Sequence, residues 1–432
     1  MGQNTEPEDF GALIRGARCS ARLTQAQLGA KCGYSASAIS RIEANKLRPE
    51  YSAMLRMFEV LAIPPQQMRG SAAPDASAVA TVTSRCPSDE EDAVRRRNLL
   101  TGALAAGATA IVGAGTASAT AVSSGPAAGL EEALFQLPAA EPVPLARLTA
   151  QTAAARQTYQ AAHYQVLGRA LPGLLAAAVA TRDAATGRAR QQASGVLARA
   201  YVLTAELASK QHSDAAWVAA DRALSAARDS RSPVPVGEAS RLLAITMRRS
   251  GHWSSAVHLL AREAAQLDAN EVRTAAVRTT LLLTAAYSAA AGGDRSTALA
   301  LLDEAEEDVK RLPGVPGLFT VEATRAQVDI YRIGALNALG TPDEGVKVAA
   351  ELSIDHMATP ERRARAWTDI GRMWHALGDG TQTFAALRQV ELEAPQEVRR
   401  PALRALTSDL LYGPTRVQGL REFAVRTGAL AA

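Results

Sequence analysis

One pattern recurs at intervals of about forty residues from near residue 145 to the end of the chain. In each copy an apolar helical stretch ends in a short polar turn, and a second helical stretch follows the turn. Since a single pair of helices cannot bury its apolar face alone, the copies must stack on one another. Alanine, which costs least in a helix, is abundant, and only 4% of the residues are aromatic. The recurrence predicts an all-α fold with a C-terminal α-solenoid. Six copies are recognised, near Gln157, Ala200, Leu242, Leu281, Ile330 and Ile370.

The turns and the residues that follow them share a common chemistry. Four of the turns contain glycine: Gly251-His252, Gly292-Gly293-Asp294, Gly340-Thr341-Pro342 and Gly378-Asp379-Gly380. A small residue near the start of each second helix lets antiparallel helices approach closely, and we assign this role to Ala215, Ala256, Ala298 and Ala385. This arrangement resembles the tetratricopeptide repeat, with longer and more divergent units. The resemblance implies helix pairs that stack into a superhelix with a concave face.

The beginning of the chain follows a different helical pattern. Thr24 can N-cap a helix, with Gln27 three residues later as its capping-box partner. Gly33 ends that helix, and a further helix follows with Ile39 and Ile42 on its inner face. Two short helices joined by a tight glycine-containing turn form the helix-turn-helix arrangement. The sequence therefore predicts an N-terminal DNA-binding domain.

The stretch from Thr24 to Pro49 resembles the Cro/phage-repressor (XRE-like) family of helix-turn-helix regulators, and the resemblance covers about residues 9–68. It implies a DNA-binding domain over residues 1–69, with a buried pair of Arg18 and Glu43 between its first and third helices. It also implies contact with duplex DNA by a set of polar and small residues: Gln25, Ser35, Ala36, Ser37, Ser40, Arg41, Lys46 and Arg48.

These residues are suited to different parts of the duplex. The resemblance places Gln25 on backbone phosphate and the third helix in the major groove. There Arg41 can read guanine through two parallel hydrogen bonds. Lys46 and Arg48 then follow phosphates or a minor groove. The net charge of +4 suits a nucleic-acid partner but does not establish one.

Residues 70–143 are predicted to form a linker, which is rich in Ala, Ser, Pro and Thr near its start. Within it, Arg95, Arg96 and Arg97 precede an uncharged stretch over residues 99–122, which looks like a twin-arginine export signal. The stretch lies about ninety residues into the chain, behind a folded domain, whereas export signals act at the terminus. Its Ala, Gly, Thr and Ser drive membrane insertion only weakly. We expect a linker or a loosely packed helix, and membrane association and export are the less favoured alternatives.

The chain carries no recognisable catalytic motif, which predicts that it is not an enzyme. The six histidines lack a shared spacing, so we expect neither a metal nor another cofactor. Cys19, Cys32 and Cys86 are not spaced for metal binding or for a disulfide framework. Cys19 and Cys32 are interpreted as small core residues. This cysteine usage and the polar, acidic start, without a signal peptide, predict a cytoplasmic protein.

The combined architecture is similar to that of actinobacterial regulators that join a Cro/repressor-type domain to tetratricopeptide-like repeats. This resemblance implies a transcriptional regulator that binds a double-stranded DNA operator, with residues 144–432 mediating homodimerisation or sensing a peptide or small-molecule effector. Peptide sensors of this architecture use asparagines, so Asn337 is a candidate ligand residue together with Arg332 and Arg325. The alternative for Asn337 is to cap the turn at Gly340. Two other functions stay open: a scaffold whose repeats bind protein partners, and a membrane-tethered regulator.

Overall fold

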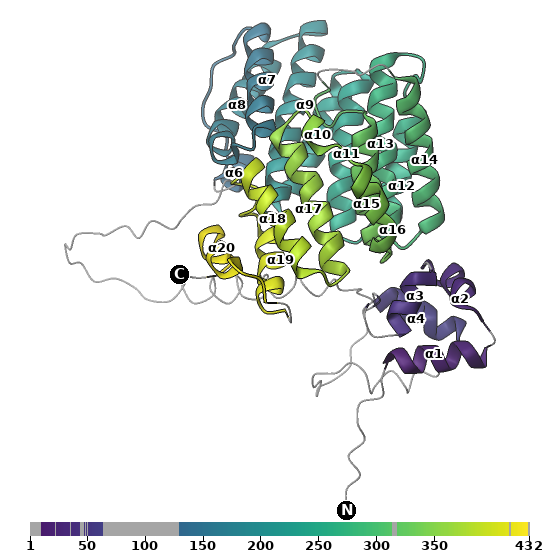
Figure 1. The fold of residues 1–432 in the computed structure, drawn as a ribbon. Helices are drawn as coiled ribbons and strands as arrows, with labels where there is room; N and C mark the ends of the chain where they lie inside the picture. Colours follow the sequence, from purple (N-terminus) through teal and green to yellow (C-terminus); the bar gives the residue numbers. More distant parts are fainter. Residues whose placement is uncertain are drawn as a thin grey trace, which may run out of the picture. The chain divides into compact units, whose positions relative to one another are not determined.

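The computed structural model describes residues 10–21, 23–34, 36–43, 47, 49, 51–63, 129–312, 318–413 and 416–430. All regular elements in these ranges are helical, and no strand occurs in them (Figure 1). The predicted all-α fold, with an N-terminal helix-turn-helix domain and a C-terminal helical repeat-like region, is confirmed. Residues 64–128, which contain the uncharged stretch 99–122 and most of the expected linker, lie outside the description.

The N-terminal part consists of four short helices around a small apolar core. They are α1 (Phe10–Ser20), α2 (Gln25–Cys32), α3 (Ala36–Glu43) and α4 (Tyr51–Val60). Leu28 from α2 and Ile39 and Ile42 from α3 are fully buried, as the sequence predicts. Cys32 is buried with them, but Cys19 is exposed. The prediction that Cys19 is a core residue is therefore wrong, because it lies on the outer side of α1.

Helix α2 begins and ends through local interactions that the sequence already contains. Thr24 accepts a hydrogen bond from the Gln27 backbone N–H (3.1 Å), and the Gln27 side chain accepts one from the Thr24 N–H (2.8 Å). The predicted capping box is therefore present. At the other end Gly33 adopts a left-handed conformation, with φ of 79°, which favours glycine because it has no Cβ.

The C-terminal region contains six successive helix pairs within the described residues, and each contains one of the copies recognised in the sequence. The first helices are α7 (Leu145–Gln160), α9 (Gly187–Lys210), α11 (Pro233–Arg249), α13 (Val272–Ala291), α15 (Arg325–Ala338) and α17 (Pro360–Ala376). The second helices are α8 (Tyr164–Ala184), α10 (Ala215–Asp229), α12 (Trp253–Ala265), α14 (Arg295–Arg311), α16 (Pro342–Glu351) and α18 (Gly380–Glu393). Each first helix packs against the first helix of the next pair. Helices α19 (Pro401–Leu411) and α20 (Leu420–Thr427) follow, and the short helix η2 (Ile354–His356) precedes α17.

The turns inside the pairs explain why glycine recurs in the sequence. The second residue after the first helix is left-handed in the last four pairs, where it is Gly251, Gly293, Gly340 or Gly378. In the first two pairs Ala162 and His212 adopt the same conformation, with φ of 58° and 56°. These two turns therefore lack the glycine that marks the later turns in the sequence.

The small residues at the helix crossings are mostly those expected. Ala256 and Ala298 are fully buried, and Ala215 is nearly so. Ala385 is exposed, however, and its predicted role is wrong. The buried residue in that pair is Thr383, which follows Gly378 at the same interval as Ala298 follows Gly293. Thr383 is not recognisable as a buried small residue from the sequence, because its hydroxyl makes it polar. In the structure this hydroxyl is satisfied locally, since it donates a hydrogen bond to the Asp379 carbonyl (2.7 Å).

The helical region begins earlier than residue 144. Helix α6 (Leu130–Phe135) packs against α8 and α10, with Leu130 and Leu134 buried. The last helices also return to the first ones: α17 contacts α7, and Phe384 and Phe423 belong to the same apolar core as Leu171 (Figure 1). The ends of the helical region are thus joined by a shared core.

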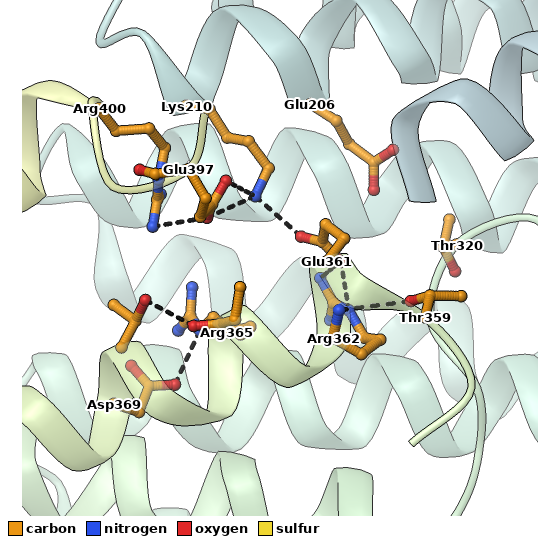
Figure 2. A network of polar contacts seen from close by, with 12 residues as sticks. Glu206, Lys210, Thr320, Thr359, Glu361, Arg362, Arg365, Asp369, Glu397 and Arg400 are labelled. Atoms are coloured by element: carbon orange, nitrogen blue, oxygen red, sulfur yellow. Dashed lines mark hydrogen bonds and ion pairs between the residues drawn. The ribbon is translucent and has the colours of Figure 1, made fainter. Parts of the chain in front are cut away.

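A buried network of charged side chains reinforces this junction (Figure 2). Nζ of Lys210, at the end of α9, lies 2.8 Å from a Glu361 carboxylate oxygen and 3.0 Å from one of Glu397. Arg400 lies 2.7 Å from Glu397. Burial by itself raises the pKa of Glu361, but the charges of Arg362 and Lys210 outweigh burial and hold that pKa well below its usual range. Glu361 is therefore ionised at neutral pH.

Candidate nucleic-acid interface

Helix α3 has one face in the core and one turned away from it. Ala38, Ile39 and Ile42 are buried against the other helices of the domain. Ser40 is exposed, and by helical register Ser40 and Arg41 lie on the side opposite Ile39 and Ile42. This is the face that a recognition helix presents to the major groove.

A polar group of three side chains fixes α3 to α1 and α2. Arg18 donates to both carboxylate oxygens of Glu43, at 2.5 and 3.0 Å, and also to the Leu23 carbonyl at 2.8 Å. Gln25 donates to Glu43 from the first turn of α2, at 2.9 Å. Only 12% of the Arg18 side chain and 4% of the Glu43 side chain are exposed. The predicted buried pair is present, and its two-point contact restricts rotation of α3 about its axis.

The charges of this group persist over a wide pH range. Burial by itself raises the pKa of Glu43, but the hydrogen bonds from Arg18 and Gln25 outweigh it and hold that pKa below its usual value. The same bond raises the pKa of Arg18. The position of α3 therefore does not depend on a proton near neutral pH.

The structure places the expected DNA-contacting residues unevenly. Gln25, Ser40 and Arg41 have described side chains on α2 and α3. Ala36 and Ser37 form the first turn of α3, but their side chains lie outside the description. Three further candidates are outside the described residues altogether: Ser35, Lys46 and Arg48.

The candidate ligand residues of the repeat region make contacts within the protein. Nδ2 of Asn337 donates to the Asp369 carbonyl of α17, at 2.9 Å. Arg325 and Arg332 both bond to Glu306 of α14, at 2.7 and 2.9 Å. The two arginines are thus brought together, whereas Asn337 joins α15 to the next first helix and its side chain does not cap the turn at Gly340. Its Oδ1 is buried without a hydrogen-bond donor.

The described residues include neither a cluster suited to a metal ion nor a helix of membrane-spanning length. Within the described ranges, no group of three or more His, Cys, Asp or Glu residues is arranged to hold a metal ion. None of the helices in those ranges is long and apolar enough to cross a bilayer. The stretch over residues 99–122, on which the export and membrane alternatives rest, is not among them.

Comparison with known families supports the reading of the N-terminal helices. A family model described as a helix-turn-helix domain matches residues 9–70. Comparison with curated proteins and with solved structures gave no match. The chain therefore contains a helix-turn-helix domain, which indicates a DNA-binding protein.

Sequence reasoning missed the buried charges of the repeat region. Lys210, Arg241 and Glu361 lie on first helices of different pairs, and each is nearly or fully buried. The available signal was the presence of charged residues inside apolar stretches of those helices. That signal does not identify partners, because Lys210 and Glu361 are 151 positions apart.

Proposed function

We propose that this protein is a cytoplasmic, sequence-specific DNA-binding transcriptional regulator without enzymatic activity. Its tetratricopeptide-like repeat region mediates homodimerisation, or senses a peptide or small-molecule effector, or does both. The observation that carries the proposal is the outward face of α3 with Ser40 and Arg41. The contacts of Arg18 and Gln25 with Glu43 hold that face in one orientation.

The chemistry of this face suits direct reading of base edges. A guanidinium on a recognition helix can bond O6 and N7 of guanine at once, which distinguishes guanine from the other bases. Serine bonds either a base or a phosphate, so Ser40 contributes less discrimination. Gln25 follows the N-cap of α2, where its amide can donate to a phosphate while Glu43 orients it.

The helical pairs support a role in assembly or sensing. Stacked helix pairs form extended surfaces that bind peptides, proteins or small molecules. A single helix-turn-helix domain reads only a short half-site, and a dimer gains affinity by engaging two half-sites about one helical turn apart. The apolar surface needed to hold a dimer is expected in the repeat region, since the small N-terminal domain uses its apolar residues for its own core.

The test is selection of a preferred operator from random duplex DNA by the full-length protein. We expect one sequence motif with two related half-sites about one helical turn apart. Arg41→Ala should weaken binding by about 1–3 kcal/mol at one or two base positions. Lys46→Ala should weaken binding to all sequences equally and reduce the salt dependence.

Arg388→Ala is the matched control, because Arg388 is an exposed arginine on α18 of the repeat region. This variant should bind the selected operator as the parent protein does. No enrichment of any sequence would contradict sequence-specific binding. Equal affinity of the Arg41→Ala variant would contradict the assignment of α3 as the recognition helix.

A further inference from the structure

Three arginines from two first helices of the repeat region lie around a pair of tyrosines, and a fourth shares a carboxylate with one of the three. We call them the arginine cluster: Arg241 and Arg248 of α11, and Arg365 and Arg372 of α17. The tyrosines are Tyr287 of α13 and Tyr331 of α15, whose rings meet edge to face with centres 6.3 Å apart. The four helices are consecutive first helices, so the cluster lies on one side of the stack.

Arg248 has no carboxylate partner. Its guanidinium carbon lies 4.5 Å from the centre of the Tyr287 ring, and Nη1 is buried without a hydrogen-bond acceptor. No ion pair to Arg248 is formed by the residues that the structure describes. Burial lowers the pKa of Arg248, and the nearby guanidiniums of Arg365 and Arg241 add to that effect. A desolvated cation with cationic neighbours is unfavourable unless an anion joins it.

Arg241 is only partly compensated. It is 5% exposed, its Nη2 donates to the Tyr331 hydroxyl at 2.8 Å, and its Nε has no acceptor. The nearest carboxylate oxygen belongs to Glu206, 4.0 Å from Nη1. That carboxylate already accepts a hydrogen bond from Arg156, so it is shared between two guanidiniums.

Arg365 and Arg372 share a single carboxylate. Asp369 accepts a hydrogen bond from Nε of Arg365 at 2.7 Å (Figure 2). It also lies 3.8 Å from Nη1 of Arg372. Among the described residues, the cluster together with Arg156 therefore has five guanidiniums for two carboxylates, Asp369 and Glu206. The side chains of Arg365 and Arg372 are 30% and 37% exposed, so solutes reach this end of the cluster.

The surrounding residues reflect the excess positive charge. Burial by itself raises the pKa of Tyr331, but the Arg241 guanidinium outweighs it and lowers that pKa to about 8. This lowering is the effect of a guanidinium that both lies close to the phenol and donates a hydrogen bond to it. The C-terminal carbonyls of α11 stabilise Arg248 only in part, because a helix terminus contributes about half a charge.

Gly334 leaves the space beside α15 that is filled by Tyr287, the tyrosine whose ring Arg248 contacts. A Cβ at Gly334 of α15 would lie 2.5 Å from a ring carbon of Tyr287 and 3.6 Å from an Asp369 oxygen. Only glycine at this position lets the Tyr287 ring of α13 approach α15 so closely, because a Cβ there would overlap the ring. The cluster is therefore a built feature of four successive repeats and not a chance arrangement of surface arginines.

From this geometry we propose that the arginine cluster binds a small multivalent oxyanion, either a phosphate ester or a polycarboxylate. The planar guanidinium fork matches the paired oxygens of both classes. Nη1 of Arg248 and Nε of Arg241 are donors without an acceptor among the described residues, and Arg365 and Arg372 form the solvent-accessible side. A role of this anion as the effector of the regulator rests on the function proposed above. Binding of the anion to the arginine cluster does not rest on that function.

The experiment measures thermal unfolding of the full-length protein with sodium pyrophosphate or sodium citrate up to about 10 mM, at ionic strength held constant with sodium chloride. We expect a saturable rise in Tm with at least one of these anions. A response to pyrophosphate alone assigns a phosphate ester, a response to citrate alone assigns a polycarboxylate, and a response to both supports the shared chemistry. No rise beyond that of chloride overturns the proposal.

Substitutions test whether the rise in Tm depends on the arginine cluster. Arg248→Gln should require about tenfold more anion for half of the rise, which corresponds to about 1.4 kcal/mol. Arg388→Gln on the exposed face of α18 should respond as the parent protein does. If Arg248→Gln does not fold, Arg372→Gln at the accessible side serves the same purpose. An unchanged response in the cluster variant overturns the proposal. Arg41→Ala separates the two hypotheses, because it should weaken operator binding and leave the anion response intact.

Discussion

At the scale of single residues, His212 shows how the fold imposes both a conformation and a protonation state. It has a left-handed backbone, with φ of 56°, at a turn where later repeats use glycine. Although His212 as a whole is exposed at the turn, partial burial of its imidazole lowers its pKa to about 4, with further contributions from Arg249, Arg400 and Arg372. His212 is therefore neutral in the folded protein at neutral pH.

This shift predicts a loss of stability in acid. The unfolded chain takes up a proton near pH 6.5, whereas the folded protein does so only near pH 4. The stability contributed by neutral His212 is complete above pH 6.5 and is lost as the pH falls toward 4. His212→Asn, which retains tolerance of the left-handed conformation, should reduce this loss. Urea unfolding at several pH values measures it, with His258→Asn on the exposed face of α12 as the control. Parallel pH profiles for the His212→Asn variant and the parent would contradict the assignment.

At the scale of elements, close approach of helices depends on particular small residues. Gly334 faces Tyr287 of α13, as described above, so a methyl group there would displace the ring. Gly173 of α8 is also helical, but a Cβ at that position would meet nothing within 4 Å. The two glycines thus have opposite roles although the sequence presents both inside helical stretches.

Alanine substitutions should separate these roles. Gly334→Ala should destabilise the protein by about 1–3 kcal/mol, because it forces α15 and α13 apart. Gly173→Ala should stabilise it by about 0.5–1 kcal/mol, because alanine loses less backbone entropy in a helix. Chemical denaturation monitored by circular dichroism gives both values. A neutral Gly334→Ala variant would show that Tyr287 is free to move.

At the scale of the whole repeat region, buried ion pairs connect its first and last helices. Lys210 is the only side chain among the described residues that pairs with both Glu361 and Glu397. Its ammonium also lies 5.4 and 5.3 Å from the rings of Tyr159 and Tyr164. Both carboxylates are almost completely excluded from solvent, so they depend on their cationic partners.

Removal of this lysine should loosen the junction. Lys210→Met should cost about 3–5 kcal/mol, because it leaves buried carboxylates undercompensated. Lys310→Met on the exposed face of α14 should change stability by less than about 0.5 kcal/mol. Hydrogen exchange should increase in α7–α9 and α17–α18 of the Lys210→Met variant alone. Exchange that rises equally across α11–α14 would indicate general destabilisation instead.

The sequence by itself determined those features whose signals lie within a few residues of one another. The capping pair of Thr24 and Gln27, the left-handed Gly33 and the glycine turns of the repeats are all local. Apolar periodicity was enough to place Leu28, Ile39 and Ile42 in a core and to divide the repeat region into helix pairs. Predictions from these signals agree with the structure because the backbone conformation of a residue, and the helix face on which it lies, are set mainly by its near neighbours in the sequence.

Only the tertiary structure decided which distant charges meet. Stacking of the pairs brings Lys210 to Glu361 and places Arg248 beside Arg365, and no spacing in the sequence indicates either encounter. The same holds for Asn337, whose amide reaches a carbonyl on the next first helix and not its own turn.

The errors at Cys19 and Ala385 have one origin, since a small or apolar side chain fits either face of a helix end until packing selects one. Long-range electrostatics depends on the superhelical path of the chain, which the sum of many helix crossings sets and no single repeat encodes.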